Sequence, residues 1–159
     1  MGIEIERKFL LKSDSWRSAG AKGLRMTQGY FDTSGATVRV RVLDESAFLT
    51  IKGRPQSDGV RSEFEYAIPV ADAQAMLKEF CGSRMVDKIR YCIEAPNDRV
   101  WEIDEYLGDN AGLFTAEIEL DDINEPFDVP EWLGVEVTGD RRYTNGALSR
   151  CPYAAWQEK

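Results

Sequence analysis

The sequence predicts a mainly β (α+β) protein built around a closed, eight-stranded antiparallel β-barrel with a polar, charged lumen and a few covering helices. Three observations lead to this fold class. Apolar and polar residues alternate with a period of two along most of the chain, whereas helical spacing occurs in three short stretches. Six of the alternating segments also carry a pair of like charges at positions i and i+2, on the face opposite their apolar side chains.

The alternating segments follow one another with turn-forming residues between them, as expected for antiparallel strands. The polar residues 44–46 predict a hairpin turn, and residues 54–59 predict a loop. Further turns are expected at 95–98 and 108–112. The predicted strands are 3–11, 24–31, 37–43, 47–53, 60–68, 85–93, 99–107, 113–120 and 133–138.

Three helices are expected between or after these strands. Residues 71–80 place apolar side chains at the spacing of one helix face. A short helix is expected to open at residues 13–16 with Ser13 as its cap. Residues 144–150 predict a final helix that ends before Pro152.

Length and composition limit the classes of function. A chain of 159 residues with 43% hydrophobic and 30% charged residues is expected to form one domain, residues 1–159. The net charge of −8 argues against a nucleic-acid partner, and no apolar run is long enough to span a membrane. Three widely spaced cysteines and the lack of a secretory signal predict free thiols and a cytoplasmic location.

The chain contains no histidine. The commonest general base and the commonest ligand for zinc, copper or iron are therefore absent. Any chemistry has to use carboxylates, Lys, Arg, Tyr or a hard metal ion held by oxygen atoms.

The like-charge pairs are the unusual feature of the predicted strands. A single pair is typical of a solvated face, but like charges on one face repel each other, so six pairs in one small domain favour a functional surface. Closing the sheet into a barrel with a polar interior uses all of them, and about eight strands leave room for one small ligand. The apolar faces then point outward and need covering helices, loops or a partner chain, so a homodimer is an option. The pairs are Glu4/Glu6, Arg39/Arg41, Glu63/Glu65, Lys88/Arg90, Glu102/Asp104 and Glu117/Glu119.

Such a lumen suits a compact polyanion together with a cation. Arginine recognises phosphate through its planar fork of donors and lysine as a point charge. Carboxylates beside a phosphate site make sense when a divalent ion such as Mg²⁺ or Mn²⁺ lies between them. The basic candidates are Lys8, Arg39, Arg41, Lys52, Lys88 and Arg90. The acidic candidates are Glu4, Glu6, Asp104, Glu117 and Glu119.

The order of these motifs resembles the CYTH domain, the fold of the triphosphate tunnel metalloenzymes, and in particular its short bacterial tripolyphosphatase-like members. The opening "EIERK" matches the ExExK signature of that family. The motifs behind it are "VRVR" (38–41), "TIKG" (50–53), "RSEFEY" (61–66), "DKIRY" (87–91), "EIDEY" (102–106), "AEIEL" (116–120) and "VTGDRRYTNGAL" (137–148).

The resemblance implies an eight-stranded tunnel that binds a small-molecule triphosphate with a divalent metal. By motif position, the acidic candidates above resemble the family's metal ligands, and the basic candidates resemble its phosphate-binding residues. Glu63 and Glu65 match tunnel acids that neutralise the arginine lining or have another role. Arg142 is expected either to close one mouth of the tunnel and contact substrate or to sit exposed as a helix cap.

The expected reaction is metal-dependent hydrolysis of inorganic tripolyphosphate. The alternatives are a class IV-type adenylyl cyclase, a thiamine triphosphatase, or a non-catalytic module that binds polyphosphate or a nucleotide. For proton handling we expect Lys8 and Tyr30 to meet inside the tunnel as a catalytic pair. The competing interpretations are that Tyr30 is wall packing, or that the metal acidifies its own water.

Overall fold

The computed structural model describes residues 2–54 and 60–156, so most of the expected loop 54–59 lies outside the described residues. The strands are β1 (Gly2–Leu11), β2 (Leu24–Tyr30), β3 (Thr37–Leu43), β4 (Ser46–Lys52), β5 (Val60–Ile68), β6 (Met85–Ala95), β7 (Arg99–Tyr106), β8 (Phe114–Glu119) and β9 (Leu133–Glu136). The helices are η1 (Ser15–Ala19), α1 (Val70–Met76), η2 (Leu77–Cys81), η3 (Gly108–Asn110), η4 (Arg141–Tyr143), α2 (Asn145–Arg150) and η5 (Tyr153–Ala155).

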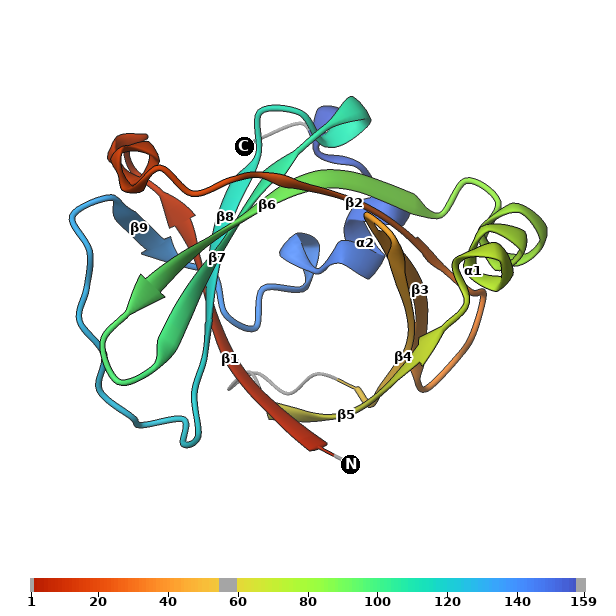
Figure 1. Cartoon of the computed structure of the whole chain (residues 1–159), viewed down its shortest axis with the longest axis horizontal. Helices are drawn as coiled ribbons and strands as arrows, with labels where there is room; N and C mark the ends of the chain where they lie inside the picture. The colour runs from red at the N-terminus through yellow and green to blue at the C-terminus, as the bar shows by residue number, and fades with distance from the viewer. Residues whose placement is uncertain (1, 55–59, 157–159) are drawn as a thin grey trace.

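Eight strands close into an antiparallel barrel, which confirms the predicted fold class. The hydrogen-bonded order is β5-β4-β3-β2-β6-β7-β8-β1. The ring closes between β1 and β5, whose four paired positions run from Gly2 opposite Glu63 to Ile5 opposite Val60. Figure 1 looks along this ring. The short strand β9 pairs with β1 outside the barrel.

Strand alternation divides the barrel into a charged interior and an apolar exterior. In β3, for example, Arg39 and Arg41 line the interior, while Val40 between them is completely buried beneath a helix. The hairpin from β3 to β4 turns at Asp44, whose φ of 54° is in the left-handed region that Asp tolerates. The period-two pattern thus predicted the faces of the strands correctly.

The apolar exterior is covered in two places. α1 and η2 lie over β2, β3 and β4, on the right in Figure 1. Gly29 permits this contact, because a Cβ atom there would lie 2.8 Å from both the Cβ and the Sγ of Cys81. On the other side, Trp16 of η1 and Trp132 of the segment before β9 pack on the outer faces of β1, β7 and β8.

Part of the apolar exterior remains exposed. Ile3 of β1 is 68% exposed and Tyr66 of β5 is 56% exposed, with Ile51 and Phe64 beside them on the outer face of β4 and β5. The structure contains one chain, so the expected homodimer stays a prediction. None of the helices that the structure describes has the length and apolar character needed to cross a bilayer.

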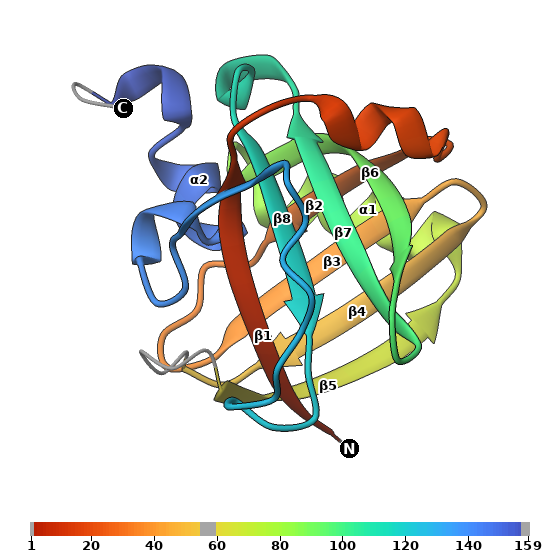
Figure 2. The same ribbon diagram turned by 90° about the vertical axis from the view of Figure 1, so that its left-hand side faces the viewer.

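The segment 141–150, which comprises η4 and α2 and is called the plug below, lies across one end of the barrel (Figures 1 and 2). Tyr143 and Leu148 of the plug pack with Val86 and Tyr106, whose side chains come from the barrel interior. The hydroxyl of Thr144 caps α2 by accepting a hydrogen bond from the Ala147 amide at 3.2 Å. The predicted helix 144–150 is therefore confirmed to within one residue.

The two other helices differ in detail from the prediction. The helix expected at 71–80 begins at Val70, and after Met76 it continues as a π-helix to Cys81. The element after β1 is a 3₁₀ helix preceded by Asp14, with no side-chain cap. Ser13 is not the cap, because Asp14 occupies that position, although the Ser13 hydroxyl accepts from the Ser15 amide at 3.4 Å and pairs with the Ser15 hydroxyl at 3.0 Å.

Candidate active site

A cavity of about 390 Å³ lies inside the barrel, and every barrel strand contributes a side chain to its lining. Acidic and basic side chains nearly balance there, so a triphosphate would not find a strongly positive site unless cations accompany it. The acidic lining residues are Glu4, Glu6, Glu63, Glu65, Glu102, Glu117, Glu119 and Asp140. The basic lining residues are Lys8, Arg39, Arg41, Lys52, Arg61, Arg90 and Arg141.

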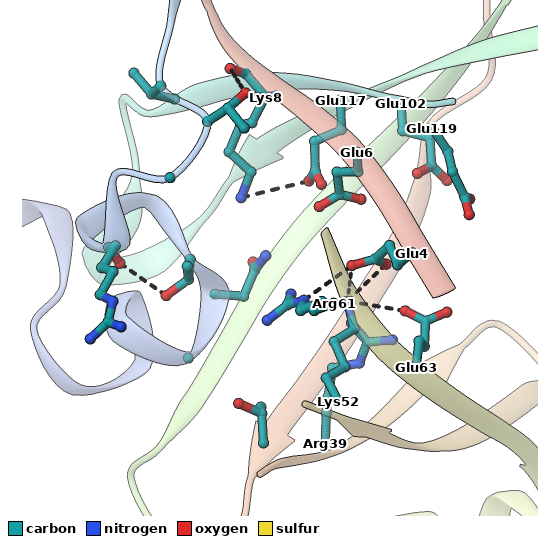
Figure 3. A pocket seen from close by; sticks show the side chains of 18 of the residues that line it. Glu4, Glu6, Lys8, Arg39, Lys52, Arg61, Glu63, Glu102, Glu117 and Glu119 are labelled. Carbon is teal, nitrogen blue, oxygen red and sulfur yellow. Dashed lines mark hydrogen bonds and ion pairs between the residues drawn. The ribbon is translucent and has the colours of Figure 1, made fainter. Parts of the chain in front are cut away.

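Acidic side chains gather on one wall of the barrel, although Arg90 donates to Glu102 at 3.1 Å and Lys8 lies 3.8 Å from Glu117 at its edges. Glu6, Glu102, Glu117 and Glu119 come from the adjacent strands β1, β7 and β8 (Figure 3). The strand register places Glu6 directly opposite Glu119, and Glu102 directly opposite Glu117. Like charges at such positions destabilise a sheet. We call these four residues the acidic wall.

Burial and mutual repulsion perturb the carboxyls of the acidic wall. Burial, followed by the neighbouring Glu117 carboxylate, holds the pKa of Glu6 well above its usual value. The pKa of Glu119 is also raised, by burial and by Glu4. Burial acts to raise the pKa of Glu117 as well, but the Lys8 ammonium and a hydrogen bond with Glu6 hold it well below the usual range. In this coupled pair, Glu6 therefore tends to hold the proton and Glu117 the negative charge.

The acidic wall fits a hard divalent cation by its donor chemistry. It offers oxygen ligands only, which Mg²⁺ and Mn²⁺ prefer, and a cation would relieve the repulsion that raises the pKa of Glu6. Within the described residues, no three carboxylates already surround a single ion position. Mg²⁺ is usually bound by one or two carboxylates together with waters and substrate phosphates, so a substrate would supply part of its ligands here.

Opposite the acidic wall, Arg39 and Arg41 of β3 line the cavity with guanidinium groups. Arg39 donates to the Thr50 hydroxyl at 3.2 Å, but its buried Nε has no hydrogen-bond partner among the described residues. Burial, together with the nearby Arg39 and Arg90, lowers the pKa of Arg41 to about 10. An unsatisfied buried donor beside crowded cations is the environment that an anionic ligand would complete.

Glu4 differs from the other candidate metal ligands because it is already paired. Lys52 donates to its carboxylate at 3.1 Å, and Arg61 donates to the other oxygen at 3.1 Å (Figure 3). Although burial opposes ionisation, these two cations lower the pKa of Glu4 to about 2. Lys52 also lies 3.2 Å from Glu63, whose pKa is raised to about 7 by burial and by its hydrogen bond with Glu4.

Lys8 and Tyr30 both line the cavity, but each has a different partner in this structure. Lys8 Nζ donates to the Tyr143 carbonyl at 2.9 Å and lies 3.8 Å from Glu117. The Tyr30 hydroxyl accepts a hydrogen bond from Gln28 Nε2 at 2.7 Å. Because Gln28 holds that oxygen as an acceptor, the hydroxyl hydrogen of Tyr30 is free to donate to a ligand. The structure does not form the expected Lys8–Tyr30 contact.

Lys88 and Asp104 lie behind the cavity lining. Both side chains are completely buried, and the Lys88 ammonium donates to Asp104 at 2.7 Å. Burial lowers the pKa of Lys88 to about 7 despite this partner. Asp104 also accepts two hydrogen bonds from Arg90, at 2.8 and 2.9 Å, and Arg90 and Lys88 lower its pKa to about 2 against the effect of burial. Of these three predicted site residues, only Arg90 lines the cavity.

The plug contributes a different arginine from the one predicted. Arg142 donates to Asp140 at 2.8 Å and lies over the ring of Trp156, with 61% of its side chain exposed, so it faces away from the cavity. Arg141 lines the cavity instead. Arg61 is another basic lining residue that the predicted set lacked, although its position shares a strand face with Glu63 in the sequence.

The comparisons with known proteins agree with this geometry. The family model "CYTH domain" matches residues 2–146. An inorganic triphosphatase of Acetivibrio thermocellus is 45% identical over 160 residues, covering 99% of this chain and all of that protein. An inorganic triphosphatase of Nitrosomonas europaea is 35% identical over 151 residues, covering 92% and 96%. The crystal structure of the inorganic triphosphatase NE1496 superposes with a TM-score of 0.64 at 32% identity, covering 94% of this chain and 95% of that one.

Proposed function

Because the chain belongs to the CYTH domain family, we propose that it is an inorganic triphosphatase that hydrolyses tripolyphosphate with the help of a divalent metal, Mg²⁺ or Mn²⁺. The observation that carries the proposal is the cavity itself, in which an acidic wall faces buried arginines across a space for one small ligand. The two curated relatives described above support the choice of substrate.

In this proposal, the basic residues bind and orient the phosphate chain. Arg39 lines the cavity with a guanidinium that also lies 3.4 Å from Glu65, and Arg41 and Arg90 add charge from the adjoining strands. Such charge-assisted contacts bind phosphate and also stabilise the charge that develops on the phosphate oxygens during transfer. Lys8 sits between the acidic wall and the plug, so it is placed to contact both a phosphate and Glu117.

The acidic wall has the complementary task. Glu6, Glu117 and Glu119, with Glu102 beside them, would hold the metal, which when bound neutralises phosphate charge and lowers the pKa of a coordinated water. Glu4 would join this set only if substrate or metal weakened its ion pairs with Lys52 and Arg61. Asp104 would act indirectly, by holding Arg90 in place from behind the lining.

Tyr30 lines the cavity with a hydroxyl hydrogen that is free to donate to the substrate. Its hydroxyl is oriented by Gln28, which in turn accepts from Arg41 at 2.9 Å. This chain of hydrogen bonds connects the tyrosine to a phosphate-binding arginine rather than to Lys8. We therefore propose Tyr30 as a positioned donor, with Lys8 as a phosphate ligand.

A substrate panel tests the proposed function. Purified protein is incubated with tripolyphosphate, ATP or thiamine triphosphate, in Mg²⁺, Mn²⁺ or EDTA, and phosphate, pyrophosphate and cyclic AMP are measured. We expect phosphate and pyrophosphate from tripolyphosphate, in the presence of metal only. Cyclic AMP from ATP would move the protein to the cyclase branch, and a preference for thiamine triphosphate would move it to that hydrolase. Binding without release of phosphate under every condition would indicate a non-catalytic module.

The remaining expectations are also part of this proposal. The three cysteines are free, one buried and two exposed, which supports a reducing, cytoplasmic environment. The homodimer is tested by size-exclusion chromatography with light scattering, in which a mass near 18.0 kDa would exclude it.

A further inference from the structure

Two side chains of the plug line the same cavity as Lys8, Arg39 and Arg41: Arg141 of η4 and Asn145 of α2. We propose that Arg141 and Asn145 form an anion subsite at the plug end of the cavity, which binds the terminal phosphate of the substrate chain. The identity of the ligand rests on the proposed function, whereas the subsite rests on the geometry of these two residues.

The hydrogen bonds of Asn145 fix the direction of its amide group. Asn145 Oδ1 accepts from the Tyr106 hydroxyl at 2.9 Å and from Lys88 Nζ at 3.3 Å. The same oxygen accepts from both groups, so Oδ1, and not the amide nitrogen, faces Tyr106 and Lys88. The Nδ2 group then points away from these partners and has none among the described residues. Since Asn145 lines the cavity, its two N–H groups are available to an anion there.

This geometry also gives Lys88 and Asp104 a role from behind the lining. Asp104 holds Lys88 at 2.7 Å, and Lys88 in turn contacts Asn145. The buried pair therefore acts as a positioning element, which keeps the donor side of Asn145 turned toward the cavity.

Arg141 is the second member of the subsite. Its guanidinium has no hydrogen bond or ion pair with the described residues, whereas its neighbour Arg142 is held by Asp140. Arg141 is exposed, and because no carboxylate of the described residues holds its guanidinium, the side chain is free to contact an anion in the cavity.

The position of the subsite follows from β1 and the plug. Along β1 the cavity residues run from Glu4 and Glu6 to Lys8, and Lys8 contacts the Tyr143 carbonyl of the plug. The subsite thus lies beyond Lys8, at the end of the cavity away from Glu4. A phosphate chain held there would place its terminal group against the plug and leave its other end near the acidic wall.

The test compares single substitutions within the plug. Arg141→Ala and Asn145→Asp are measured beside Arg142→Ala and Arg150→Ala, an exposed position of α2. Asn145→Asp keeps an acceptor for Lys88 and Tyr106 but replaces the two donors with an oxygen. Binding of tripolyphosphate is measured by calorimetry in EDTA, where no turnover accompanies it, and KM and kcat are measured with Mg²⁺. Thermal melting without ligand checks the fold.

We expect Arg141→Ala and Asn145→Asp to raise Kd and KM about 10- to 100-fold, the range for loss of a charge-assisted contact. Arg141→Lys should recover part of the affinity. Arg150→Ala should match wild type, and Arg142→Ala should have a smaller effect than Arg141→Ala. If these two residues make no contact with the ligand, Arg141→Ala and Asn145→Asp should bind within about twofold of wild type. That result would overturn the subsite. Wild-type protein that binds tripolyphosphate but does not hydrolyse it with Mg²⁺ would overturn the proposed function alone, and wild-type protein that binds it neither in EDTA nor with Mg²⁺ would overturn both.

Discussion

Replacing Lys88 with methionine should change how the stability of the protein depends on pH. Lys88 is completely buried, and its pKa falls from 10.5 to about 7 in the folded state. Folding therefore disfavours the charged ammonium form of Lys88. Between pH 7 and pH 10.5 the unfolded chain consequently binds more protons than the native protein. Stability contributed by this group then rises with pH over that interval. Methionine has no such group, and Arg90 still satisfies Asp104 in the variant.

The size of the effect follows from the two pKa values. A full difference of one bound proton changes the free energy of unfolding by about 1.4 kcal/mol per pH unit. Because native Lys88 is about half protonated at pH 7, the integrated change from pH 7 to pH 9 is about 2 kcal/mol. Removing one partner of a buried ion pair is itself destabilising, although Asp104 keeps two hydrogen bonds from Arg90, so the test rests on the pH dependence and not on the stability at a single pH.

Urea denaturation in EDTA at pH 7, 8 and 9 measures this directly. The unfolding free energy of wild type, relative to Lys88→Met, should increase by about 2 kcal/mol over the range. Lys78→Met, at an exposed helix position, is the control and should follow wild type. If the unfolding free energies of wild type and Lys88→Met change in parallel with pH, the reasoning is refuted. That result would mean that Lys88 stays protonated, or stays in contact with solvent, over the whole pH range.

Four further substitutions separate repulsion, pairing, catalysis and substrate binding. Glu6→Gln should raise the melting temperature in EDTA, because it removes the repulsion that raises the pKa of Glu6. It should also lower Mg²⁺-dependent turnover by orders of magnitude. A lower melting temperature would contradict the repulsion. Glu4→Gln should instead destabilise the metal-free protein by about 3 kcal/mol at neutral pH. The pKa of Glu4 is near 2 in the folded protein, so its ionised carboxylate contributes stability at pH values above the unfolded pKa, and this stability is lost as the pH falls. Equal unfolding free energies by urea titration would count against the pairing. Tyr30→Phe should lower turnover with KM unchanged and leave the Gln28 amide without an acceptor, and wild-type turnover at every pH would reduce Tyr30 to packing. Arg41→Ala should raise the KM for tripolyphosphate by tenfold or more without loss of stability, since it relieves crowding among cations, and an unchanged KM would remove Arg41 from the site.

The barrel could be predicted from the sequence because strand alternation is a local signal. A period of two places Arg39 and Arg41 on one face whatever the rest of the chain does. The like charges of Glu117 and Glu119 then make an enclosed polar surface more plausible than a solvated one. The structure confirms the closed barrel, and most strand bounds agree with the prediction to within two residues.

The residues behind and beside the cavity could not be predicted in the same way. Whether Lys88 faces the ligand or a carboxylate depends on the register between β6 and β7, which places Arg90 opposite Asp104. Strand alternation says nothing about that register. Likewise, Arg141 and Arg142 are neighbours in a 3₁₀ turn, where neither period two nor helical spacing determines which side chain turns inward. Their difference became visible only once the Asp140 pair was located.

The arrangement of charge also explains why a stable barrel would retain so much repulsion. Glu6 lies opposite Glu119, while Arg41 is crowded by Arg39 and Arg90, so each wall alone is destabilising. Lys8 and Arg90 pair with Glu117 and Glu102, but pairing every acid with a base would fill the cavity. The incomplete pairing leaves a site that a polyanion and a cation complete when they bind together. By linkage, tripolyphosphate and Mg²⁺ added jointly should stabilise the folded protein more than the sum of their separate effects, because each ligand neutralises charge that the other needs neutralised.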